Sequence, residues 1–346
     1  MDFGSINLIA RDADKALVTY LKLFGTNNVQ EVIRLQELKD DTETVDGYYL
    51  KTKPLHLGIF TPRGAAGRMG KSLTKNGEGI HHLTFHMGQD EFEQTYLKFK
   101  DEGRPVSGKV IYLGRFSEAM FWLDEAGEQG VPMKFATTCY QGLTMWENTM
   151  YLDTPKKFEK MKITDEYLRP RVVLNSAMVT VNEFEKQQKI WSGILSRPAV
   201  ETGDIFRLTP GKVDDGRGNI FIPIRFQFSD SKGINLYCTI NEDAPIKKVM
   251  SKRGVNGMIH NSACYVTRDR VHEYFGQLEE AGFSMVDPKP ALNMNKGNGN
   301  YFFFVHPRSV HGVLWEVVSI FTRDMSARAR YDYSDTATYM VPPDLN

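Results

Sequence analysis

The sequence predicts an α+β fold in which tandem βαβββ modules pair into two domains, each with curved mixed sheets and outer helices. Two observations predict it. Four amphipathic segments have the same helical pattern and begin near residues 12, 89, 182 and 267. A short strand-like run precedes each of them and several follow it, rich in β-branched and aromatic residues. One helix with several strands is a supersecondary module, and two modules together make a domain.

The first predicted helix carries the most complete signals. Asp12 can cap its N-terminus, and Gly25 can take the left-handed conformation that ends it. An apolar stripe between them predicts one buried face, formed by Ala16, Leu17, Tyr20, Leu21 and Phe24. The same pattern returns in the segments 89–103, 182–195 and 267–282, with an expected cap at Asn182 and expected stops at Gly103 and Gly282.

These elements group into two halves of the chain. We expect a first paired-module domain over residues 1–145 and a second over residues 172–321. The polar, Lys-rich segment 146–171 predicts a linker between them. The periodicity stops near the C-terminus, so residues 322–346 are expected to form a surface tail.

Composition narrows the class of protein. The 346 residues include 43 Lys and Arg and 43 Asp and Glu, so the net charge is zero and no nucleic-acid partner is favoured. No apolar run approaches the roughly 18 residues that a membrane helix needs, and the N-terminal residues do not look like a signal peptide. The cysteines form no C-x-x-C pair, which is typical of a reducing compartment. We therefore expect a cytoplasmic protein without a membrane partner.

Residues 77–87, GEGIHHLTFHM, hold three of the chain's eight histidines. Side chains alternate between the two faces of a strand, so His82 and His86 are expected on one face and His81 on the other. Such a cluster can be a metal site, an acid–base group or a strand that carries imidazoles for structural reasons. We favour a site role for His82 and a structural role for His81.

Three segments resemble the vicinal oxygen chelate superfamily, which includes glyoxalase I, methylmalonyl-CoA epimerase, bleomycin-resistance proteins and type I extradiol dioxygenases. They are residues 77–87, 244–261 and 306–318, in the order that the superfamily has. The resemblance implies paired modules that curl into a cleft, where His, Gln and Glu side chains hold a divalent metal. That cofactor would be iron, manganese, cobalt, nickel or zinc, and it would bind neighbouring substrate oxygens.

The resemblance places the ligand positions of the first domain residue by residue. Ser5 stands at the first position, and Gly58 stands at the second with His56 two residues away. His82 matches the third position. Lys134 stands where a glutamate is expected, and an ammonium group is a poor metal ligand that repels a cation. This implies that the first domain is the structural or substrate-closing half.

In the second domain, Asn175 and Ser176 stand where the resemblance implies a histidine. Asn261 occupies the next ligand position, with His260 beside it as a reserve candidate, and Glu316 retains the final carboxylate. A carboxylate in an otherwise apolar strand is expensive to bury unless it is paired or ligating, which favours a site role. The metal-ligand candidates are His56, His82, His260 and Glu316.

The function implied is an isomerase, epimerase or lyase that moves a proton through an enolate on a small carbonyl or thioester substrate. Glu316 would be the base or a ligand, with Tyr237 and Asn261 as polar partners by strand position. One alternative is an iron-dependent extradiol-type ring-cleaving dioxygenase, which the four-module layout favours. Another is a non-enzymatic small-molecule-binding protein of the resistance type. Paired-module domains often dimerise, so a homodimer is an expected state.

Two basic segments remain. The Gly-rich segment 61–79 is expected to be a loop that could close over an anionic substrate, and it carries Arg63, Arg68, Lys71 and Lys75. A second group on the fourth module consists of Lys247, Lys248, Lys252 and Arg253. A solvated charged surface is the favoured interpretation of the second group.

Overall fold

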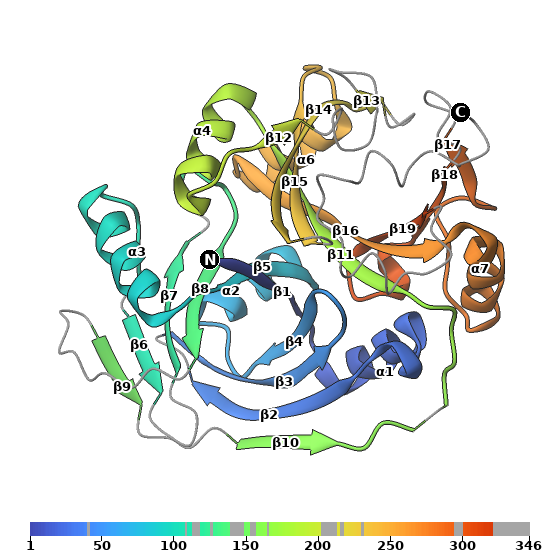
Figure 1. Cartoon of the computed structure of the whole chain (residues 1–346), viewed down its shortest axis with the longest axis horizontal. Helices are drawn as coiled ribbons and strands as arrows, with labels where there is room; N and C mark the ends of the chain where they lie inside the picture. The colour runs from blue at the N-terminus through green and yellow to red at the C-terminus, as the bar shows by residue number, and fades with distance from the viewer. Residues whose placement is uncertain are drawn as a thin grey trace. The chain divides into compact units, whose positions relative to one another are not determined.

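The contacts of the chain divide it into two compact units, each discontinuous in sequence (Figure 1). The computed structural model describes residues 1–39, 42–107, 109–112, 118–124, 127–138, 149–152, 157–164, 166–201, 213–214, 218–229, 232–293 and 300–320. The first unit consists of Met1–Leu17, Glu31–Lys51 and His56–Ile163, and the second consists of Val18–Gln30, Thr52–Leu55 and Thr164–Asn346. Helix α1 (Ala13–Phe24) therefore contributes residues to both. The expected tail, residues 322–346, lies outside the described residues.

The first unit is built on a mixed sheet whose ten described strands have the order β10-β2-β3-β4-β1-β5-β8-β7-β6-β9. These strands are β1 (Asp2–Ile9), β2 (Glu31–Lys39), β3 (Thr44–Lys51), β4 (His56–Pro62), β5 (Gly79–His86), β6 (Lys109–Tyr112), β7 (Glu118–Leu123), β8 (Met133–Thr138), β9 (Thr149–Leu152) and β10 (Lys157–Met161). Its helices beside α1 are α2 (Arg68–Asn76) and α3 (Gln89–Asp101).

The second unit has a mixed sheet of nine described strands in the order β12-β14-β15-β11-β16-β19-β18-β17, with β13 paired to β14. These are β11 (Val173–Val181), β12 (Val200–Glu201), β13 (Val213–Asp214), β14 (Ile220–Ser229), β15 (Lys232–Thr239), β16 (Gly257–Thr267), β17 (Ala291–Asn293), β18 (Asn300–Val305) and β19 (Leu314–Ile320). The helices are α4 (Phe184–Leu195), α6 (Pro245–Arg253) and α7 (Val271–Glu280), with short 3₁₀ turns at Thr26–Asn28, Arg268–Arg270 and Pro307–Ser309.

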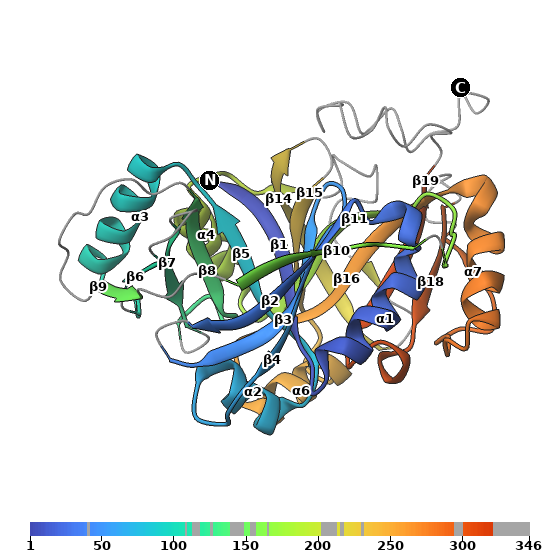
Figure 2. The same ribbon diagram turned by 90° about the horizontal axis from the view of Figure 1, so that it is seen from below.

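The two sheets repeat one pairing scheme, which confirms the predicted tandem modules. In the first unit β1 pairs in parallel with β4 and antiparallel with β5, and β5 pairs in parallel with β8. In the second unit β11 pairs in parallel with β15 and antiparallel with β16, and β16 pairs in parallel with β19. Each module thus contributes a sheet segment, and its helix covers that segment, as α7 does beside β18 in Figures 1 and 2.

Local signals placed most helix ends correctly. The backbone N–H of Lys15 donates to Asp12 Oδ1 over 3.0 Å, which is the predicted N-cap of α1. Gly25 has the positive φ of 85° that the predicted stop requires. The expected cap at Asn182 is wrong, because Glu183 precedes α4 with φ 54° and no side-chain cap bond forms.

Two segments expected to be irregular have regular structure. Arg68–Asn76 form helix α2 inside the segment that was expected to be a loop, and Met69 buries its side chain against the neighbouring strands. Gly67 and Gly77 bound this helix, so its nine residues are too few to show a clear apolar period. Part of the expected linker is also paired, because β10 forms an antiparallel ladder with β2.

An aromatic cluster holds α3 against the first sheet. The Phe121 ring is fully buried, and its centroid lies 5.1 Å from that of Phe92 and 5.3 Å from that of Tyr96 on α3. Phe135 of the neighbouring strand β8 stacks on Phe121 at 5.0 Å. One face of β7 and β8 is therefore filled by helix contacts, which leaves the alternate residues of these strands to form the opposite face.

The second sheet is packed in the same way. Trp315 of β19 contacts Tyr20 and Phe24 of α1 at centroid distances of 5.7 and 5.3 Å. Phe226 of β14 stacks on Trp191 of α4 at 6.2 Å. Both strand residues point to the helix-covered face, so the residues adjacent to them in sequence point to the other face.

Candidate functional site

The polar residues of the second unit gather on the sheet face opposite to α1, α4 and α7. Helix α6 packs against one end of this face, where Ile246 and Met250 form an apolar cluster with Phe221 and Tyr237. Glu316 follows the helix-facing Trp315 on β19, and Arg225 precedes the helix-facing Phe226 on β14. Tyr237 of β15 lies on the same face as Arg225, because it is two residues from Asn235, which pairs with Arg225. We call it the concave face of the second unit.

A chain of three polar side chains ends at the Glu316 carboxylate. The Asn261 amide Nδ2 donates to Glu316 Oε2 over 2.8 Å. Asn261 Oδ1 lies 3.0 Å from His260 Nδ1. Because an amide oxygen only accepts, His260 donates its Nδ1 proton in this contact and fixes which end of the amide faces Glu316. The structure therefore brings together three of the residues that the sequence singled out.

A β-bulge explains why two consecutive residues of one strand take part. Met178 pairs with Asn261, but the next residue, Val179, pairs with Ile259, so His260 has no partner in the register. The bulge interrupts the strict alternation by which a shift of one residue moves a side chain to the other face. The first unit has the same shift, since Asn7 pairs with His82 and Leu8 pairs with Ile80.

Arg225 belongs to this site, although the sequence analysis did not select it. Its side chain is fully buried, and its guanidinium donates to Asn235 Oδ1 at 3.0 Å and to Gln227 Oε1 at 2.8 Å, with Asn175 Oδ1 at 3.4 Å. A side chain at Gly233 would place its Cβ 2.6 Å from Arg225 Nε, so only glycine leaves room for the guanidinium. The signal in the sequence was an arginine in an otherwise apolar strand, the same pattern that selected Glu316.

Tyr237 lies on the same face as a proton donor. Burial raises the pKa of its hydroxyl well above the ordinary value, and the negative charge of Glu316 raises it further, while Arg225 opposes the shift. The phenol therefore stays protonated near neutral pH. This position favours hydrogen bonding to a developing negative charge and not removal of a proton.

In the first unit the bulge brings His81 and His82 together, contrary to the expectation that they face opposite sides. Their Nδ1 atoms lie 2.9 Å apart, so one ring donates to the other. Trp122 packs against both, with centroid distances of 6.3 Å to His81 and 4.6 Å to His82. His56 lies apart from this pair, against the ring of Tyr49 at 5.7 Å.

The histidine pair is neutral in the folded protein. Burial lowers the pKa of His81 to about 3, and the Arg68 guanidinium adds to the effect. Burial also lowers the pKa of His82 well below its ordinary value, helped by His81, Lys134 and Arg68. As the pH falls to about 6.5, the ordinary pKa of histidine, both side chains take up a proton in the unfolded chain but stay neutral in the folded chain.

We expect this pair to make stability depend on pH. Because both folded pKa values are depressed, the free energy of unfolding should fall as the pH drops below about 6.5 and should not change above it on account of these groups. The slope expected for each histidine is about 1.4 kcal/mol per pH unit. Urea unfolding of wild type and of the double variant His81→Gln, His82→Gln at several pH values measures it. Equal slopes in the two proteins would contradict the assignment.

The described residues do not fit the divalent metal that the resemblance implies. No three His, Cys, Asp or Glu side chains come together among them. At the concave face of the second unit, Asn261 directs the donor end of its amide at Glu316, and a metal would need the oxygen end. In the first unit, the positive charges of Lys134 and Arg68 act on His82. The ligand roles of His56, His82, His260 and Glu316 remain predictions.

The comparisons with known proteins support the fold. No known protein family matches the sequence, and no curated protein matches it. A mutant 4-hydroxymandelate synthase from Streptomyces coelicolor has a similar structure, with a TM-score of 0.60 and 10% identity over 97% of this chain and 98% of that chain. A methylmalonyl-CoA epimerase has a TM-score of 0.33 and 16% identity over 43% of this chain and 95% of its own. A methylmalonyl-CoA epimerase from Streptomyces coelicolor has a TM-score of 0.32 and 19% identity over 42% of this chain and 92% of its own.

The match along the whole chain confirms the predicted fold class. The chain has the four-module, two-sheet architecture that was expected from its resemblance to the vicinal oxygen chelate superfamily. No described helix is long and apolar enough to cross a membrane.

Proposed function

We propose that the chain is an enzyme that moves a proton on a small carbonyl or thioester substrate, through an enolate, at the concave face of the second unit. The observation that carries the proposal is the 2.8 Å hydrogen bond from Asn261 to Glu316. It holds a carboxylate in a fixed orientation on a face that also carries a protonated phenol and a buried guanidinium. A base, a donor and a positive charge on one concave face are the parts that enolate chemistry needs.

Each residue has a stated role in the proposed step. Glu316 takes the proton from the carbon next to the carbonyl, and the C–H electron pair forms the enolate double bond as the carbonyl oxygen becomes negative. The Tyr237 hydroxyl and the Arg225 guanidinium stabilise that oxygen. Asn261 orients Glu316, and His260 orients Asn261, so both are positioning residues. Return of the proton to the carbon completes an isomerisation or epimerisation.

No step of this proposal requires a metal. When bound to proteins of this type, a divalent metal supplies Lewis-acid stabilisation of the substrate oxygens. Because Asn261 directs its amide N–H at Glu316, we expect Tyr237 and Arg225, and not a metal, to stabilise the substrate oxygen. Removal of divalent ions with a chelator should therefore leave the rate of proton exchange unchanged within about twofold.

A second candidate function is an iron-dependent ring-cleaving dioxygenase. The four-module layout favours it, and the structural match over 97% of the chain is to a protein named as a 4-hydroxymandelate synthase. Non-haem iron oxygenases use two histidines and one carboxylate. The described residues of the concave face offer one histidine, His260, and one carboxylate, Glu316, so proton transfer remains the favoured proposal.

Deuterium exchange tests the proposal directly. The purified chain is incubated in D₂O with a panel of small 2-oxo acids, 3-oxo acids and acyl-CoA thioesters, and NMR follows the proton next to each carbonyl. We expect one class to lose that signal faster with protein than without it. Oxygen uptake with an aromatic substrate would favour the dioxygenase instead. Binding of a panel member without exchange or oxygen uptake would favour a small-molecule-binding protein. Sedimentation of the same sample tests the predicted homodimer.

A further inference from the structure

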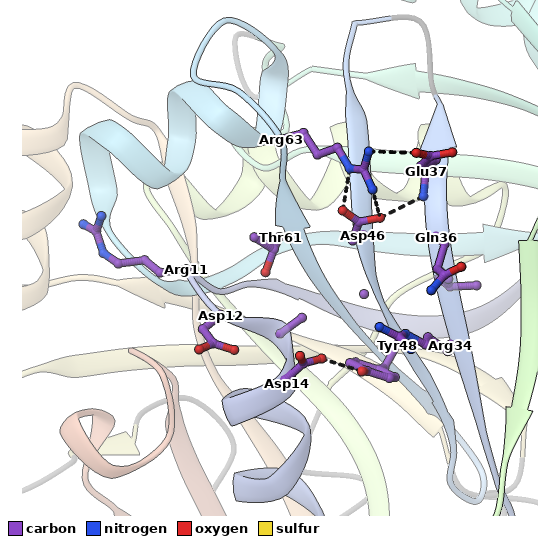
Figure 3. A pocket seen from close by; sticks show the side chains of 13 residues that line it. Arg11, Asp12, Asp14, Arg34, Gln36, Glu37, Asp46, Tyr48, Thr61 and Arg63 are labelled. Carbon is purple, nitrogen blue, oxygen red and sulfur yellow. Dashed lines mark hydrogen bonds and ion pairs between the residues drawn. The ribbon is translucent and has the colours of Figure 1, made fainter.

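A cavity of about 540 Å³ lies in the first unit, and neither residue of the histidine pair lines it. It is bounded by the N-terminal turn of α1 and by strands β2, β3 and β4 (Figure 3). Arg34 and Asp46 line it, and their sequence neighbours Leu35 and Val45 pack into an apolar cluster, although Leu35 also contributes to the lining. The volume is within the range of roughly 300–1,000 Å³ that is typical of small-molecule sites.

One wall of the cavity is a closed network of charges. Arg63 donates to both carboxylate oxygens of Asp46, at 2.5 and 2.9 Å, and to Glu37 Oε1 at 3.0 Å. The Glu37 backbone N–H also donates to Asp46 Oδ1 at 2.8 Å. Both oxygens of Asp46 are therefore occupied, as the dashed lines of Figure 3 show. This carboxylate cannot serve another cation in the cavity without losing these bonds.

A β-bulge shapes the same wall. The register between β2 and β3 shifts between Leu35 and Leu38, and Glu37 has a positive φ of 52°. Because the bulge interrupts the alternation of side chains, the consecutive residues Gln36 and Glu37 both line the cavity. A non-glycine residue in this conformation is strained, and such strain often occurs at binding sites.

Arg34 is a cation of this cavity that has no carboxylate partner among the described residues, as is Arg11. The half-buried guanidinium of Arg34 forms no hydrogen bond or ion pair with the residues that the structure describes. Its positive charge acts to lower the pKa of Asp46 and of Tyr48. Burying a charge is unfavourable unless it is paired. The Gln36 amide lies beside Arg34 in Figure 3 and can add a hydrogen bond to the same anion.

The opposite wall offers a carboxylate. Asp14 accepts a 2.5 Å hydrogen bond from the Tyr48 hydroxyl on Oδ1, and its second oxygen has no bonding partner among the described residues. Burial raises the pKa of Tyr48 to about 12, and Asp14 raises it while Arg34 opposes it, so this hydroxyl lies within reach of both charges. Asp12 is already held by Lys15 at 3.1 Å.

We propose that this cavity binds a small zwitterion of the α-amino-acid class, with its carboxylate at Arg34 and Gln36 and its ammonium group at Asp14. The guanidinium fork suits a planar carboxylate, which it can bind through two hydrogen bonds. The ammonium group donates to Asp14 Oδ2, the carboxylate oxygen that does not accept from Tyr48. This site lies in the first unit, so its occupation does not depend on the function proposed for the second unit.

Calorimetry with the full-length chain tests the proposal. The probes are the twenty standard L-amino acids, together with the amine and the N-acetyl derivative of each one that binds. We expect at least one amino acid to bind at least tenfold more tightly than either derivative. The variants Arg34→Gln and Asp14→Asn should each weaken that binding at least tenfold. Arg34→Lys keeps the charge without the fork, so it should lose less than Arg34→Gln.

Arg104→Gln is the matched control, because it removes one arginine of the first unit whose partner, Glu102, lies outside the cavity. Its affinity should stay within twofold of wild type. No binding by wild type would overturn the proposal. The same follows if the N-acetyl derivative binds as tightly as the amino acid, or if Arg34→Gln and Arg34→Lys both keep the wild-type affinity while circular dichroism shows an intact fold.

Discussion

Replacement of Glu316 by Gln should slow exchange of the substrate proton by about 10²–10⁴-fold, the range typical of a lost general base. The glutamine oxygen can still accept the hydrogen bond from Asn261, so the local geometry is kept. An amide does not take up a proton near neutral pH, and only the chemistry is lost. The measurement is the rate of deuterium incorporation at saturating substrate, followed by NMR for both proteins.

Two further variants separate catalysis from folding. Glu280→Gln removes an exposed carboxylate on α7 and should keep the wild-type rate within twofold. Asn261→Ala removes the group that orients Glu316 and should give a smaller loss than Glu316→Gln, since the base itself remains. If Glu316→Gln exchanges protons as fast as wild type with an unchanged circular dichroism spectrum, Glu316 is not the base.

The elements that the sequence predicted best are those whose signals are local. The cap at Asp12, the stop at Gly25 and the apolar stripe between them define α1 without reference to any other part of the chain. The repeat of this unit four times then predicted the paired sheets, because each helix needs a sheet face to bury its stripe. Asn182 failed as a cap because the backbone turns one residue later, at Glu183.

The candidate site was only partly predictable because it depends on register. Strict alternation would separate His260 from Asn261, and the bulge opposite Met178 lets His260 contact Asn261, which in turn bonds Glu316. A bulge is set by the pairing of two strands far apart in sequence, so neither strand shows it alone. Arg225 was recognisable as a charged residue in an apolar strand. Of its three amide partners, however, only Gln227 lies on the same strand, and Asn235 and Asn175 come from β15 and β11.

The zwitterion cavity shows the same limit more strongly. Arg34 and Tyr48 are opposite each other in the β2–β3 register, and Asp14 arrives from a helix that precedes both strands. Nothing in the local sequence distinguishes Arg34 from other arginines of the first unit. Arg34 lacks a carboxylate partner because both oxygens of Asp46 already accept hydrogen bonds from Arg63, and these bonds form only in the folded protein.

Phe121→Ala is expected to lower the free energy of unfolding by about 3–5 kcal/mol, since it removes a fully buried ring and leaves a cavity. The ring contacts Phe92 and Tyr96 of α3 and Phe135 of β8, so both helix and sheet lose packing partners. Urea unfolding of the full chain measures the change. Phe121→Leu fills part of the cavity and should lose less. A loss below about 1 kcal/mol for Phe121→Ala would contradict this account of the core.

Phe121→Ala should also change the packing around the histidine pair on the other face of the sheet. Phe121 and Trp122 are consecutive on β7, so the strand that Phe121 anchors to α3 also positions the indole 4.6 Å from His82. Protein interiors are close-packed and transmit small displacements. We therefore expect Phe121→Ala to weaken the pH dependence of stability that His81 and His82 confer, because a looser Trp122 admits water to both rings. Phe121→Leu should retain it.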